Sequence, residues 1–153
     1  MALPQRSRMR VTRRIAADPT STALLLAGPT AVELWPGARR IGEADGRLLV
    51  EAEPPTAPAP ELFAVRALPP QRTPTAYVTR FEWAGAGGET TRSVSCRLTL
   101  AYAPTADGTP VTHAVLECDV DDDAPMSVLA LTAMGEGFLA NLARAAETRN
   151  RAA

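Results

Sequence analysis

The chain has 153 residues and contains no lysine, since all 16 of its basic residues are arginine. This excludes a lysine as Schiff-base nucleophile or general base. The chain also has only one histidine and two cysteines, and two cysteines are too few to build a disulfide scaffold. The longest apolar runs are too short to cross a bilayer, and Arg13 and Arg14 lack the apolar stretch that follows a twin-arginine signal. We therefore expect a cytoplasmic protein without stable membrane insertion.

The composition is that of an ordinary globular protein, with 46% hydrophobic and 22% charged residues and a net charge of -1. Arginines gather in residues 6–14, but no aromatic residues lie between them, so nucleic-acid binding is a poor fit. A solvated edge strand accounts better for this cluster. We expect a loose N-terminal arm over residues 1–7 and a single domain over residues 8–153.

The most informative segment is a predicted amphipathic helix from Ala124 to Arg149. Its apolar residues recur at spacings of three and four: Val128, Leu131, Gly135, Phe138, Leu142 and Ala145. An acidic run, residues 121–123, and Pro125 mark its start, and arginines crowd its end. A helix this long needs a large apolar surface to cover.

Strands before the helix can supply that surface. The pattern predicts a first strand over residues 9–16, a short helix capped by Asp18 and Pro19, and a second short helix over residues 30–34. Strand-like segments follow at residues 39–43, 48–53, 62–68, 76–83, 91–102 and 111–120, with the prolines confined to the connections. Each long strand alternates between apolar and polar residues, which is typical of an antiparallel sheet covered on one face.

This order of elements resembles the START-like helix-grip superfamily (SRPBCC), which includes polyketide cyclases, lipid-transfer START domains and Bet v 1-type proteins. Three local segments carry the likeness: residues 14–19 at the first strand and helix, residues 34–37 (Leu-Trp-Pro-Gly), and residues 137–142 in the long helix. The resemblance implies an α+β fold in which a curved antiparallel sheet of about seven strands wraps around the C-terminal helix. It also implies a cavity between sheet and helix that takes an apolar ligand.

Residues with reactive side chains have simpler explanations. His113 lies by strand phase on the wet face, and no Gly-x-Ser-x-Gly motif accompanies it. Cys96 and Cys118 are expected to face each other on the inner face, where small buried hydrophobes are the favoured interpretation over a redox or ligand-contact role. The acidic run 119–123 lacks the pattern of a calcium loop and serves to cap the helix. We predict no catalytic constellation, no metal and no cofactor.

The favoured hypothesis is a protein that binds a hydrophobic or lipid-like small molecule between the sheet and the C-terminal helix. A polyketide cyclase or dehydratase using the same cavity is the second hypothesis, with Arg13, Tyr77 and Thr79 as inward polar candidates, and a ligand-free partner-binding module is the third. The oligomeric state and the ligand stay open. The residues expected to line the cavity are Arg13, Trp35, Tyr77, Thr79, Phe81, Trp83, Cys96, Leu98, Leu100, Leu116, Cys118, Leu131, Phe138 and Leu142.

Overall fold

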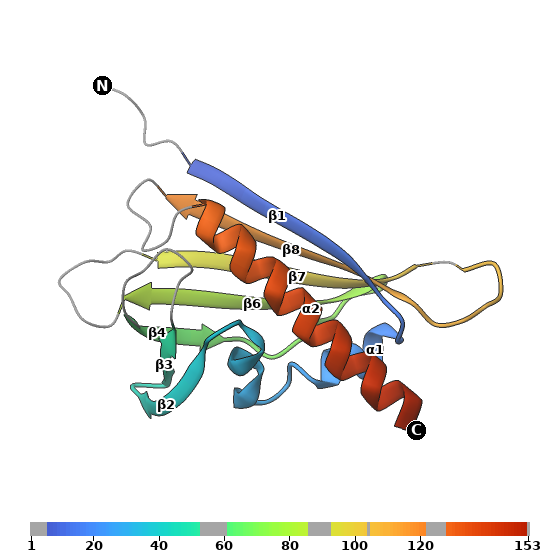
Figure 1. Ribbon diagram of the computed structural model, residues 1–153, viewed down its shortest axis with the longest axis horizontal. Coiled ribbons are helices and arrows are strands. Elements are labelled where there is room, and N and C mark those ends of the chain that lie inside the picture. The colour runs from blue at the N-terminus through green and yellow to red at the C-terminus, as the bar shows by residue number, and fades with distance from the viewer. Residues whose placement is uncertain (1–5, 53–60, 86–92, 104, 122–127, 153) are drawn as a thin grey trace.

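A computed structural model describes residues 6–52, 61–85, 93–103, 105–121 and 128–152 (Figure 1). Its elements are β1 (Arg6–Ile15), α1 (Pro19–Leu24), the 3₁₀ helix η1 (Pro29–Leu34), β2 (Arg39–Ala44), β3 (Arg47–Ala52), β4 (Glu61–Ala67), β5 (Gln71–Arg72), β6 (Ala76–Gly85), β7 (Ser93–Tyr102), β8 (Thr112–Asp121) and α2 (Val128–Ala152). The predicted order is confirmed, with one short strand, β5, added.

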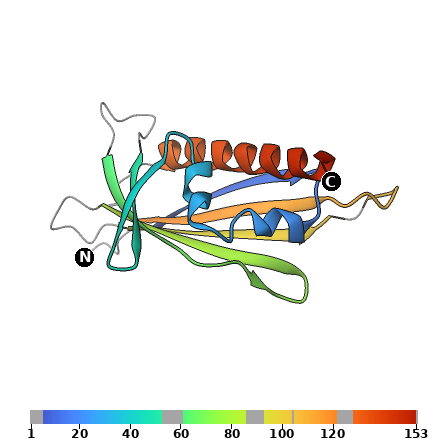
Figure 2. The ribbon, with the colours of Figure 1, turned by 90° about the horizontal axis from the view of Figure 1, so that it is seen from below.

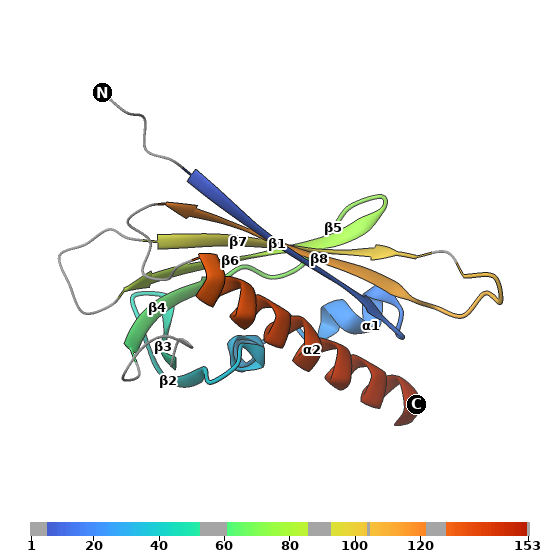
Figure 3. The ribbon, with the colours of Figure 1, turned by 45° about the horizontal axis from the view of Figure 1, so that its top comes forward.

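All strands join one antiparallel eight-stranded sheet in the order β1-β8-β7-β6-β4-β3-β2, and β5 pairs with β6 beside this path (Figure 3). The first strand thus lies against the last, with Val11 opposite Leu116. Because β1 is at the end of this order, its exposed arginines lie along a sheet edge, as the sequence predicts.

Residues in the chain itself determine where α1 begins and how β2 turns into β3. Asp18 caps α1, since its Oδ1 accepts the backbone N–H of Ser21 at 2.7 Å and Pro19 occupies the first helical turn. Between β2 and β3 the chain turns at Asp45 and Gly46, whose φ angles are 54° and 75°. Two central residues with positive φ form the tight turn that matches the twist of a hairpin.

Helix α2 covers one face of the sheet, together with α1 and η1, and the strands β2, β3 and β4 curve up at one end of the sheet (Figure 2). The covered face, called the inner face here, carries the apolar residues of each strand. Leu98, Leu100 and Leu116 are at most 1% exposed there. Because Gly135 has no side chain, α2 can lie close to the sheet at this point: an added Cβ would be 2.9 Å from Met9 Cε and 3.1 Å from Leu116 Cδ2. The predicted curved sheet under a long C-terminal helix is therefore present.

Several boundaries differ from the sequence pattern. Strand β1 begins at Arg6, inside the predicted N-terminal arm. The predicted start of the long helix at Ala124, with Asp122, Asp123 and Pro125, lies outside the described residues, and α2 is described from Val128. No helix in the described part of the chain is long and apolar enough to cross a membrane.

Candidate functional site

The centre of the inner face is packed with aromatic rings. Trp35 stacks on Phe138 with 4.5 Å between ring centroids and meets Trp83 edge-on at 5.5 Å. Phe81 contacts both Trp35 and Phe138, at 6.0 and 5.6 Å. These rings join β6, α2 and the segment after η1 into one cluster. Side chains therefore fill the space between sheet and helix at this point.

Most residues expected to line a cavity belong to this packed interior. The buried ones are Trp35, Thr79, Phe81, Trp83, Cys96, Leu98, Leu100, Leu116, Cys118, Leu131, Phe138 and Leu142. Thr79 adds no free polar group, because its hydroxyl donates to the Leu68 carbonyl. Arg13 is exposed although Val11 and Ile15 on either side of it are buried. Its long side chain reaches water in the manner typical of arginine at the rim of an apolar surface.

Cys96 and Cys118 form a disulfide, with 4.1 Å between their Cα atoms. They are directly opposite each other on β7 and β8, as the strand phases predict, and are at most 2% exposed. The interpretation as two small buried thiols is therefore corrected. Phase places the two side chains together, and that proximity allows the bond to form.

Space for a ligand is found at the end of the inner face next to α1. A pocket of about 350 Å³ lies between the start of α1, the turn from β5 to β6 and the end of β7. We call it the α1 pocket. It is lined by Pro19, Thr20, Arg72, Thr73, Pro74, Thr75, Ala76, Tyr77 and Tyr102. Of the candidates named from the sequence, Tyr77 contributes to it.

Hydroxyl groups meet on the wall of the α1 pocket. Tyr77 Oη and Thr20 Oγ1 are 3.1 Å apart, and either can be the donor. Each hydroxyl has one hydrogen, so their mutual bond leaves one O–H free to donate to another acceptor. The turn that precedes Tyr77 is fixed by hydrogen bonds, because Thr73 Oγ1 accepts the Ala76 N–H at 3.0 Å and donates to the Ala76 carbonyl, also at 3.0 Å. The pocket thus combines a hydrogen-bonded turn with one hydroxyl hydrogen that can be donated to a ligand.

The sequence offered only a weak signal for the α1 pocket. Its lining comes largely from the proline-rich connection after β4 and from the first turn of α1, which alternation in the strands does not describe. Thr20 and Arg72 were therefore missed. Tyr102, which shares the inner phase of Leu98 and Leu100, is 64% exposed at the mouth.

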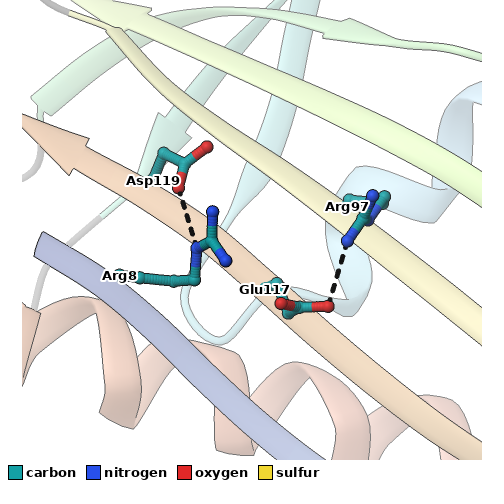
Figure 4. Close-up of polar contacts among 4 residues, drawn as sticks. All are labelled: Arg8, Arg97, Glu117 and Asp119. Atoms are coloured by element: carbon teal, nitrogen blue, oxygen red, sulfur yellow. Dashed lines mark hydrogen bonds and ion pairs between the residues drawn. The ribbon is translucent and has the colours of Figure 1, made fainter. Parts of the chain in front are cut away.

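A second hollow, of about 160 Å³, lies on the opposite, outer face of the sheet. Two ion pairs run beside it, Arg8 with Asp119 and Arg97 with Glu117, each at 3.2 Å (Figure 4). Within each pair the two charges already neutralise each other, and such exposed ion pairs contribute little to stability. This hollow is small and polar, which makes it a poorer site for an apolar ligand than the α1 pocket.

Acid–base and metal chemistry find little support. His113 is exposed on the outer face, as predicted, and the described residues hold no group of three or more histidine, cysteine, aspartate or glutamate side chains placed to bind a metal. Asp107 has a lowered pKa because the Thr109 backbone N–H donates to its carboxylate, but it lies in the exposed loop between β7 and β8.

No protein-family model matches the chain, and no curated protein is similar to it in sequence. Solved structures are similar in fold. An aromatase/cyclase from Streptomyces sp. R1128 is 18% identical, with a TM-score of 0.63 over 97% of this chain and 98% of its own. A START superfamily protein from Mycobacterium smegmatis is 16% identical, with a TM-score of 0.55 over 93% of this chain and 95% of its own.

The major latex-like protein 151 of Panax ginseng is 6% identical, with a TM-score of 0.64 over 92% of this chain and 97% of its own. At such identities these likenesses define the fold and no more. The chain has the START-like helix-grip fold, which confirms the resemblance found in the sequence.

Proposed function

We propose that the protein binds a hydrophobic or lipid-like small molecule on the inner face of its sheet, in the α1 pocket. The observation that carries this proposal is the pocket itself. Its volume of about 350 Å³ lies within the range of small-molecule sites. It opens at the end of the inner face where the packed aromatic cluster does not reach.

The lining of the α1 pocket favours a ligand with an apolar body and one polar end. The rings of Tyr77 and Tyr102, with Pro19 and Pro74, offer apolar surface. The free O–H of the Tyr77–Thr20 pair can donate to an oxygen of the ligand. Arg72 at the rim supplies a positive charge that can pair with a carboxylate of the ligand. A fatty acid or a fused-ring aromatic acid fits this description.

Calorimetric titration with a panel of medium-chain fatty acids and fused-ring aromatic acids and ketones tests the proposal. We expect saturable binding by at least one class, with a negative heat-capacity change from the burial of apolar surface. Tyr102→Ala removes a pocket wall and weakens binding about tenfold or more. The matched control is Thr99→Ala, on the same strand but facing outward, and leaves affinity unchanged. Absence of saturable binding across the whole panel contradicts the proposal.

The alternative function is a cyclase or dehydratase of the polyketide type. The hydroxyl pair of Tyr77 and Thr20 favours it, since such groups can position a reactive carbonyl chain. Against it, Arg13 is exposed and the Thr79 hydroxyl is already bonded to a carbonyl. The inward polar candidates therefore do not converge, and binding is the better supported function.

Product analysis separates the two functions. An enzyme accelerates ring closure or dehydration of a poly-β-carbonyl substrate, and Tyr77→Phe lowers that rate more than it lowers affinity. A carrier binds the same compound and returns it unchanged. The third possibility, a partner-binding module, predicts no small-molecule binding at all, and the same calorimetric panel tests it.

A further inference from the structure

The outer face of the sheet carries an uneven row of charges. The strand register places four residues side by side across neighbouring strands: Arg10 on β1, Glu117 on β8, Arg97 on β7 and Arg80 on β6. We call them the cationic row. Adjacent strands are about 4.8 Å apart, so the row is about 14 Å long. Glu117 pairs with Arg97 at 3.2 Å (Figure 4), whereas no ion pair joins Arg10 or Arg80 to another described residue.

The pairing of Arg80 with Arg97 is unfavourable in the protein alone. The two residues are directly opposite each other on β6 and β7, and like charges in that position destabilise a sheet. Both side chains are exposed, so water lowers this cost without removing it. A negative charge placed over the pair is attracted by both guanidinium groups. The cationic row is therefore stabilised by a bound anionic group.

A second row, beside the first, has no charge. It lies two residues further along each strand and consists of Thr12, Val115, Thr99 and Val78. The last three are half-buried and present methyl groups on the outer face. Residues two apart on a strand point to the same face and are about 7 Å apart, so the two rows run in parallel. A partner that covers both rows meets positive charge on one side and small apolar groups on the other.

We propose that these two rows form a docking surface for a helix of another protein, with acidic residues along one side and apolar residues next to them. The length of about 14 Å corresponds to about nine helical residues at 1.5 Å each. Acidic residues three and four positions apart share one side of such a helix, so they can follow the cationic row. Their carboxylates can each accept two hydrogen bonds from a guanidinium group. The surface lies on the face opposite the α1 pocket and does not depend on a ligand there.

The neighbouring charges favour a protein over other polyanions. On the other side of the cationic row lie Glu82 and Asp119, of which Asp119 pairs with Arg8 at 3.2 Å. A chain of phosphates or an anionic membrane presents negative charge everywhere, so it meets these carboxylates as well as the arginines. A helix can place its acidic residues over the arginines alone. The two rows, whose residues are all described, also hold no large apolar side chain of the kind that inserts into a membrane.

Two fluorescently labelled, alanine-based helical peptides of the same composition test the surface. In the first peptide, glutamates recur at spacings of three and four beside a line of valines, and in the second the same residues are scrambled around the helix. We expect the first peptide to bind about fivefold more tightly by fluorescence anisotropy, because only its charges match the row. Added salt weakens this binding by screening the charges. In ¹⁵N NMR spectra the first peptide shifts the amide signals of Thr99 and Val115.

Charge-reversing variants assign the effect to the cationic row. Arg10→Glu and Arg80→Glu each reverse an unmatched charge, and each weakens binding of the first peptide about tenfold. Arg149→Glu is the matched control, because it changes the net charge equally but lies in the last turn of α2. It leaves the affinity within about twofold of the unaltered protein. Arg80→Glu also removes the repulsion with Arg97, so a loss of binding in this variant does not come from unfolding.

Several results would overturn the docking surface. Equal affinity for the two peptides, or an equal effect of Arg80→Glu and Arg149→Glu, leaves only general charge attraction. Binding of neither peptide also overturns the proposal. Duplex DNA and vesicles of phosphatidylserine with phosphatidylcholine are titrated in the same way, and tighter binding of either one than of the first peptide replaces the protein partner by that polyanion. None of these results bears on the proposed function, which the calorimetric panel tests separately.

Discussion

Replacing Gly137 by alanine is expected to destabilise the protein, although alanine is the better helix former. Gly137 lies inside α2, where the exchange alone favours the helix by about 1 kcal/mol. The added methyl group, however, overlaps the ring of Pro36, with further ring atoms at 3.3 and 3.4 Å. A proline ring cannot turn away as a flexible side chain does, so α2 or the segment around Pro36 must move.

Such a movement meets resistance from two neighbouring contacts. Asn141 Nδ2 donates to the Leu34 carbonyl at 2.8 Å, and Trp35 stacks on Phe138 at 4.5 Å. Overpacking of this kind costs about 1–3 kcal/mol, and subtracting the helix gain of about 1 kcal/mol leaves a net loss of up to about 2 kcal/mol. Because the overlap is with a rigid ring, we expect the upper part of this range. Urea unfolding followed by far-ultraviolet circular dichroism measures this loss as a lower midpoint.

Gly135→Ala is the matched control in the same helix. There the nearest atom to an added Cβ is Met9 Cε at 2.9 Å, the tip of a flexible side chain that can turn aside. We expect its stability to stay within about 0.5 kcal/mol of the unaltered protein, because the helix gain offsets the crowding. A Gly137→Ala protein as stable as the unaltered one, or an equal loss in both variants, refutes this account of the helix contact.

Three further predictions concern other parts of the molecule. Reduction of the Cys96–Cys118 disulfide, whose cysteines are 22 residues apart, lowers the free energy of unfolding by about 3 kcal/mol. Urea unfolding with and without reductant measures this loss, and a Cys96→Ala/Cys118→Ala protein is insensitive to the reductant. Asp18→Ala removes the cap of α1 and lowers stability by about 1 kcal/mol, whereas Asp18→Asn retains most of it in the same assay. Asp107 titrates below its ordinary value of 3.8 in an NMR pH series, since the Thr109 backbone N–H stabilises its charged form; its contribution to stability is present above that ordinary value and is lost as the pH falls through the lowered pKa.

The sheet could be predicted from the sequence because its signals are local. A period of two along β6, β7 and β8 assigns every residue to a face, and prolines mark where strands stop. The same phase places Cys96 opposite Cys118. It does not say whether the two thiols are oxidised, which depends on the redox state of the compartment as well as on distance. A persistent disulfide is typical of oxidising compartments, so the cytoplasmic location stays a prediction.

The candidate site was harder to predict because it depends on contacts between distant segments. The α1 pocket needs Thr20 from the first helix beside Tyr77 from the middle of the sheet, and no periodicity links them. At Arg13 the strand phase predicts an inward side chain, but the residue is exposed. Its long charged side chain can reach water from an inward position, which a short side chain could not. Phase assigns a face, and the length and charge of the side chain decide whether it is buried.

Binding on the inner face can be tested most directly by measuring intermolecular nuclear Overhauser effects between a saturating ligand from the panel and the protein. We expect contacts between ligand protons and the ring of Tyr77, and none to Val78, its neighbour on β6 that faces the other side of the sheet. Contacts to Val78 without contacts to Tyr77 would place the ligand on the outer face. That result, or the absence of any saturable ligand, would contradict binding on the inner face.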